Sequence, residues 1–151
     1  MKTAILYYSK HHGNTLKLVE AIKAADDSVT LIDVTKSESP DLSEFDLIGI
    51  ASGIYAANFS AEIRSFTEEH LPKGKKVFFL FTSSLNKPSF TNSIRKIADA
   101  KMANVVGQYG CTGYDTFGPF KLIGGVAKGH PDAAEIAGAV SFYQDLLIQL
   151  S

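Results

Sequence analysis

The sequence predicts an α/β domain in which five parallel strands form a doubly wound sheet between two layers of helices. Short apolar β-type segments alternate along the 151 residues with segments whose apolar positions recur at helical spacing. Four loops that follow strands are rich in Gly, Ser, Thr, Asn or aromatic residues, whereas the opposite connections are short turns. Strands that alternate with helices pair in parallel through right-handed crossovers. We therefore expect one domain over residues 1–151.

Five segments have the composition of strands, and the first is expected to be covered on both faces. The first is an unbroken apolar run, and the fourth (KVFFLF) is the clearest central strand. The five expected strands are Thr3–Tyr8, Val29–Val34, Phe45–Ala51, Lys76–Phe81 and Ala103–Cys111.

Four segments have the apolar periodicity of helices that cover such a sheet. They are Asn14–Ala25, Ser60–His70, Asn86–Ala100 and Asp132–Leu150. In the second helix Ala61, Ile63 and Phe66 are expected to face inward. Pro88 suits the first turn of the third helix, and Asp132 is the expected N-cap of the fourth.

Composition excludes several classes of protein. An apolar content of 45% with 21% charged residues is ordinary for a globular chain, and no apolar run approaches the ~18 residues of a membrane span. The formal net charge of −1 gives no electrostatic case for nucleic acid. A single cysteine, Cys111, fits a reducing compartment. We expect a cytoplasmic protein with no membrane insertion and no nucleic-acid partner.

The loop between the first strand and the first helix has the composition of an anion site. Backbone N–H groups at a helix start lack intrahelical partners and favour negative charge. Glycine lets the backbone approach a ligand, while hydroxyl, amide, imidazole and ammonium groups add donors. These residues are Ser9, Lys10, His11, His12, Gly13, Asn14 and Thr15. The alternative is an ordinary helix start in which Asn14 or Thr15 is the cap.

The same loop matches neither of the common nucleotide fingerprints. It lacks GxxxxGK[ST] and GxGxxG, so neither a P-loop NTPase nor a dinucleotide-binding fold is indicated. Adjacent histidines cannot share a helix face, and no metal site is expected. A compact phosphate loop suited to a mononucleotide monophosphate is what remains.

The run SKHHGNT, set between an apolar strand and an amphipathic helix, resembles the phosphate loop of the flavodoxin family. The resemblance extends over essentially the whole chain. It implies strand order 2-1-3-4-5 and non-covalent FMN, with the phosphate surrounded by residues 9–15. The family's hydroxyl residues in the middle of this loop are here replaced by Lys10, His11 and His12.

The resemblance also implies that two later loops flank the flavin ring. In SGIYAANF, Ser52, Gly53 and Ile54 would supply backbone near the ring edge, with the Gly53 peptide beside flavin N5. Tyr55 is the candidate for stacking, unless Tyr55 and Phe59 are simply core residues. In the other loop the candidates are Thr82, Ser83, Ser84 and Leu85.

The Gly-rich segment Thr112–Pro131 is long for a connection inside one domain, which indicates function. We interpret it as a lid near the flavin. Its candidate contacts to the ring or to a partner are Gly113, Tyr114, Phe117 and Phe120. The alternative is that these aromatic side chains only hold the segment against the sheet. Cys111, just before it, is expected to be a buried thiol.

The resemblance implies a monomeric electron carrier that uses FMN and exchanges electrons with redox partner proteins. The 15 basic and 16 acidic residues of this chain differ from the strongly acidic balance that is usual in that family. One alternative is an FMN-dependent NAD(P)H/quinone or protoporphyrinogen-type oxidoreductase on the same scaffold. Another is a flavin-free binding module.

Overall fold

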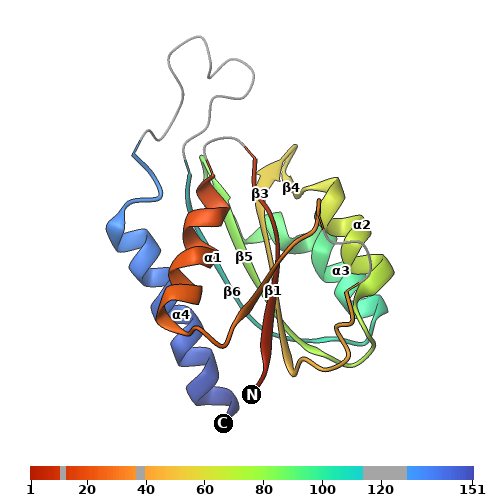
Figure 1. Ribbon diagram of the computed structural model, residues 1–151. Helices are drawn as coiled ribbons and strands as arrows, with labels where there is room; N and C mark the ends of the chain where they lie inside the picture. Colours follow the sequence, from red (N-terminus) through yellow and green to blue (C-terminus); the bar gives the residue numbers. More distant parts are fainter. Residues whose placement is uncertain (11–12, 37–39, 114–128) are drawn as a thin grey trace.

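The computed structural model describes residues 1–10, 13–36, 40–113 and 129–151 (Figure 1). Its main sheet is parallel, with strand order β2-β1-β3-β5-β6. Because β4 is a short side branch, this order is the predicted 2-1-3-4-5. The strands are β1 (Thr3–Tyr8), β2 (Thr30–Asp33), β3 (Leu47–Tyr55), β5 (Lys76–Ser83) and β6 (Asn104–Thr112).

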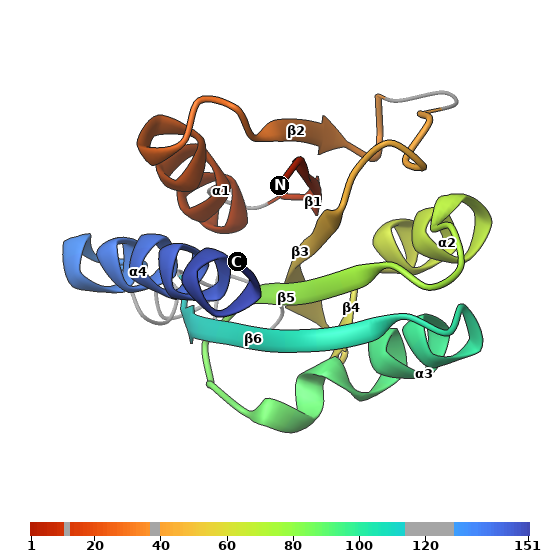
Figure 2. The ribbon, with the colours of Figure 1, turned by 90° about the horizontal axis from the view of Figure 1, so that it is seen from below.

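Helices cover both faces of the sheet, as expected of a doubly wound fold. The helices α1 (Asn14–Ala25) and α4 (Ala133–Leu150) lie on one face, and α2 (Ala61–His70) and α3 (Asn92–Ala100) lie on the other (Figures 1 and 2). None of the described helices is both long and apolar enough to cross a membrane.

Alternate strand residues feed two separate cores. Ile5, Leu47 and Phe78 belong to the cluster beneath α1 and α4, whereas the next residue of each strand belongs to the cluster beneath α2 and α3. All six side chains are fully buried. This burial on both faces explains why β1, β3 and β5 are largely continuous apolar runs without polar alternation.

A short hairpin at the end of β3 was not predicted. The strand continues past Ala51 to Tyr55, turns, and pairs antiparallel with β4 (Asn58–Phe59). The two turn residues, Ala56 and Ala57, have φ of 51° and 63°. Two positive φ values are what a two-residue type I′ turn needs. The expected loop is therefore a hairpin that projects at the carboxyl edge of the sheet.

Two helix predictions need correction. The expected helix from Asn86 instead begins as the 3₁₀ turn η1 (Pro88–Thr91), followed by α3, because Lys87 before the proline is extended. In α2, Ala61 is exposed and does not face inward as predicted, whereas Ile63 and Phe66 are buried.

The start of α4 confirms the predicted cap. The Asp132 carboxylate accepts from the Glu135 N–H (2.8 Å), and the Glu135 carboxylate accepts from the Asp132 N–H (2.9 Å). This reciprocal capping box fixes the residue at which α4 begins.

Candidate functional site

A cleft of about 540 Å³ lies at the carboxyl ends of the central strands. Its walls come from the β1–α1 loop, the β3–β4 hairpin, the segment between β5 and η1, and the end of β6. In open parallel sheets this edge, where the strand order reverses between β1 and β3, is where ligands bind. The volume is within the usual range for small-molecule sites.

The first turn of α1 opens directly onto the cleft. The N-cap of α1 is Gly13, with φ of 65°, so no side chain of the N-cap residue caps the helix. Asn14 and Thr15 follow it, are buried and line the cleft. The alternative with Asn14 or Thr15 as the cap is therefore wrong. The Thr15 hydroxyl instead hydrogen-bonds the Thr82 hydroxyl of β5, with 3.0 Å between the oxygens. The Leu16 N–H donates to Ser9 Oγ (3.2 Å).

One wall of the cleft is built on two tyrosines. Tyr8 is buried at the end of β1, and its ring meets that of Tyr55 edge-on, with 5.9 Å between centroids. The Lys10 ammonium lies 5.8 Å from the Tyr8 ring centroid, within cation–π range. Tyr55 is half-buried and both packs on the core and lines the cleft. Phe59 is fully buried, as the core alternative expects.

The opposite side of the cleft depends on a close approach at Gly113. Its N–H donates to the Ser83 carbonyl (2.9 Å), which joins the ends of β5 and β6. A Cβ at Gly113 would lie 2.8 Å from the Asn14 side-chain nitrogen and 3.1 Å from Thr82 Cβ. Only glycine fits here without displacing cleft residues.

Most of the residues predicted for the site lie together. Eleven line the cleft: Lys10, Asn14, Thr15, Gly53, Ile54, Tyr55, Thr82, Ser83, Ser84, Leu85 and Gly113. Ser9, Gly13 and Ser52 do not line the cleft. Ser52 is fully buried, accepts from the Ser60 N–H (3.0 Å) and donates to the Gly53 carbonyl (2.5 Å). His11, His12, Tyr114, Phe117 and Phe120 lie outside the described residues.

The charges on the described lining have one sign. Lys10 and Lys87 line the cleft, and no carboxylate of the described residues does. Cys111 is a buried thiol near this edge, as predicted, and burial raises its pKa to about 12. At neutral pH it is therefore protonated and a poor nucleophile.

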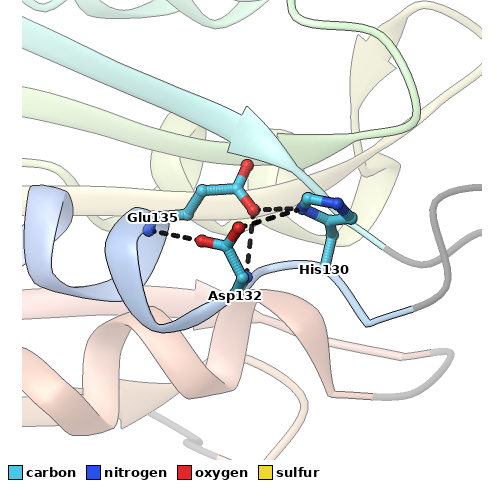
Figure 3. A group of neighbouring side chains, drawn as sticks. All are labelled: His130, Asp132 and Glu135. Atoms are coloured by element: carbon cyan, nitrogen blue, oxygen red, sulfur yellow. Dashed lines mark hydrogen bonds and ion pairs between the residues drawn. The ribbon is translucent and has the colours of Figure 1, made fainter.

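A polar cluster fastens the start of α4 to the sheet (Figure 3). The Glu135 carboxylate contacts His130 Nδ1 and accepts from the Thr112 N–H of β6 (3.0 Å). The hydrogen bond to Glu135 raises the pKa of His130. Burial alone would raise the pKa of Glu135, but its hydrogen bonds from the Asp132 N–H, His130 and the Thr112 N–H outweigh burial and lower it.

The same three side chains have metal-ligand chemistry. One ligand atom each from His130, Asp132 and Glu135 lies within 4.8 Å of the others. Both carboxylates already accept the hydrogen bonds of the capping box, however, and the cluster sits at a positive helix end. Its contacts are accounted for by its anchoring role.

Comparison with known proteins agrees with this geometry. The model of the Flavodoxin domain family matches residues 4–118. An uncharacterized protein of Methanocaldococcus jannaschii is 37% identical over 150 residues, which are 97% of this chain and 99% of the relative. This chain belongs to the flavodoxin family. The resemblance inferred from the loop at residues 9–15 is confirmed.

Solved structures confirm the flavodoxin fold. Oxidised flavodoxin 2 from Bacillus cereus superimposes with a TM-score of 0.72 at 17% identity, covering 99% of both chains. A flavoprotein from Lactobacillus acidophilus, solved in complex with FMN, gives a TM-score of 0.57 at 22% identity and covers 74% of this chain and 92% of that one.

Four residues that line the cleft were not predicted from the sequence: Ala56, Ala57, Lys87 and Phe90. The two alanines come to the cleft through the unpredicted hairpin turn. Lys87 and Phe90 do so because η1 replaces the first turn of an expected α-helix. Pro88 was the signal in the sequence that could have placed Lys87 in the loop, because the residue before a proline disfavours helical conformation.

Proposed function

We propose that this protein is an FMN-binding electron carrier of the flavodoxin family. The observation that carries the proposal is a single cleft with a helix N-terminus at one end and apolar side chains at the other. FMN has a matching division into a phosphate and a flat, largely apolar ring.

The phosphate end fits an anion. The first turn of α1 faces the cleft, where its N–H groups and the helix dipole favour negative charge. Thr15 adds a hydroxyl, and Lys10 adds a positive charge held beside Tyr8. Gly113 leaves room for the Asn14 side chain at this end of the cleft, because a Cβ at position 113 would press against it.

The other end fits a flavin ring. Ile54, Tyr55, Leu85 and Phe90 supply apolar walls from two loops on either side of the cleft. Leu85 is 58% exposed on the cleft lining, where its side chain is free to cover a ring. When bound, FMN supplies the electron-transfer chemistry, and the residues of this chain bind, orient and shield it.

The chemistry of the lining favours a carrier over an enzyme. Among the described residues, no carboxylate, imidazole or thiol lines the cleft to exchange protons with a separate substrate. A carrier needs no such group. We propose redox proteins as its partners, a monomer as its working form and the cytoplasm as its location.

Equilibrium titration with FMN and riboflavin tests the proposal. FMN should bind tightly, and riboflavin, which lacks only the phosphate, roughly 100-fold more weakly, or about 2.7 kcal/mol, because several charge-assisted hydrogen bonds are lost. Equal affinities would show that the cleft does not bind the phosphate. If neither FMN nor riboflavin binds, the flavin-free binding module is favoured instead. Rapid bleaching of the bound FMN by NAD(P)H alone would favour the oxidoreductase.

A further inference from the structure

The two charged residues on the described cleft lining stand at opposite sides of it. Lys10 follows β1, whereas Lys87 follows β5, and β3 runs between these strands. Adjacent strands are about 4.8 Å apart, so the two loops are separated by roughly 10 Å of sheet. Lys87 also lies between Leu85 and Phe90, two of the apolar residues that line the cleft, whereas Lys10 lies in the loop that leads into the first turn of α1. A ligand whose phosphate lies at the α1 terminus and whose ring lies against these apolar side chains therefore has Lys87 on the side of its ring.

We propose that Lys87 makes the cleft bind reduced FMN more tightly relative to oxidised FMN, whereas Lys10 serves the phosphate in both states. This inference rests on the proposed function. It gives the two lysines separate tasks, one in holding the cofactor and one in setting how readily the cofactor accepts electrons.

The physical reason is charge. Reduction of a bound flavin by two electrons from an external reductant, with one proton from water, would add one negative charge to its ring and leave its phosphate unchanged. A cation on the ring side attracts that added charge, and no carboxylate on the described lining opposes it. Because Lys87 is exposed, water and salt screen the attraction, so an effect of several-fold is expected.

The side chain of Lys87 is separable from the fold. Its backbone carbonyl accepts from the Phe90 N–H (3.1 Å) and so starts η1. A Lys87→Gln substitution keeps this backbone bond and removes only the charge. Lys73→Gln is a matched control, because Lys73 is also exposed but lies in the α2–β5 turn at the opposite edge of the sheet.

The test combines two measurements on the full chain loaded with FMN. The dissociation constant of oxidised FMN comes from fluorescence quenching, and the two-electron midpoint potential comes from dithionite titration against a reference dye. Together they give the dissociation constant of reduced FMN through the thermodynamic cycle. Lys87→Gln should raise the ratio of reduced to oxidised dissociation constants about 3- to 10-fold, and less at high salt.

The other variants give the contrast. Lys10→Gln should weaken both redox forms by a similar factor and leave the ratio within about 2-fold, and Lys73→Gln should change neither constant. The inference is overturned if Lys87→Gln leaves the ratio unchanged, or if Lys73→Gln shifts it equally. If the wild-type chain binds no FMN in either state, the proposed function itself has failed.

Discussion

At the scale of single residues, the cleft depends on a buried pair of hydroxyls. Thr15 from α1 and Thr82 from β5 are 1% and 3% exposed, and they hydrogen-bond each other. Thr82→Val keeps the shape of the side chain but leaves the buried Thr15 hydroxyl without this hydrogen-bond partner. We expect a loss of about 1–3 kcal/mol in the free energy of unfolding, measured by urea denaturation.

The double variant Thr15→Val/Thr82→Val is the control for that prediction. Replacing both hydroxyls by methyl groups removes the unpaired polar group, so the double variant should be more stable than the sum of the single losses predicts. Strict additivity of the two single effects would show that the hydroxyls do not interact.

At the same scale, Gly113 shows why part of the site could not be predicted in physical terms. The sequence alone placed it in a loop of interest. Its requirement for glycine arises from contact with Asn14, a residue 99 positions earlier. Contacts of this kind exist only after the sheet has formed, and no local pattern encodes them.

At the scale of elements, the β3–β4 hairpin carries local strain. Ala56 and Ala57 both adopt positive φ, where a side-chain Cβ costs ~1–2 kcal/mol relative to glycine. We expect Ala57→Gly to stabilise the protein by about 0.5–1 kcal/mol, since relief of strain exceeds the added entropy of the unfolded chain. Denaturant unfolding measures the change.

A matched glycine substitution separates strain from a general effect. Ala24 is exposed in α1, where Ala24→Gly should destabilise by about 0.5–1 kcal/mol. Destabilisation by Ala57→Gly of the same size would contradict the left-handed turn.

The start of α4 predicts a dependence of stability on pH. Glu135 raises the pKa of His130 above 6.5, so the stabilisation from protonated His130 is full below pH ~6.5 and is lost as the pH rises through the folded pKa. Glu135 contributes above its unfolded pKa near 4.5, and this is lost as the pH falls through its lowered folded pKa. Their joint contribution should be largest between about pH 4.5 and 6.5.

Glu135→Gln tests this pairing while keeping the cap, because glutamine also serves in a capping box. Its melting temperature should fall most below wild type in that window. At alkaline pH the difference should shrink to the part that comes from the Asp132 and Thr112 N–H bonds to the carboxylate. The pKa of His130, followed by NMR, should drop toward 6.5 in the variant. An unchanged pKa would show that Glu135 does not charge the imidazole.

Helices and strands differed in how well local pattern predicted them. Continuous apolar runs identified β1, β3 and β5, because these strands are buried on both faces. The edge strands β2 and β6 are only partly buried. The hairpin turn was missed because Ala56-Ala57 carries no turn signal and adopts its conformation only through pairing of Ile54 with Phe59. Local sequence therefore predicted the buried elements and missed one that tertiary pairing imposes.

At the scale of the whole molecule, the near-neutral net charge conceals an uneven arrangement. The chain has a formal charge of −1, yet the described lining of its cleft carries lysines and no carboxylate. The sign of the cleft could not be predicted, because Lys87 reaches it only through the 3₁₀ start of the third helical segment. The parallel sheet and the cleft at its carboxyl edge did follow from the alternation of elements, whereas the strand order followed from the resemblance to the flavodoxin family.

A crystal structure of the protein with FMN tests the central claim most directly. We expect phosphate oxygens within hydrogen-bond distance of the first-turn N–H groups of α1, and the flavin ring between the β3–β4 hairpin and the segment 83–87. A cleft that stays empty at saturating FMN, or a flavin bound elsewhere on the molecule, would contradict it.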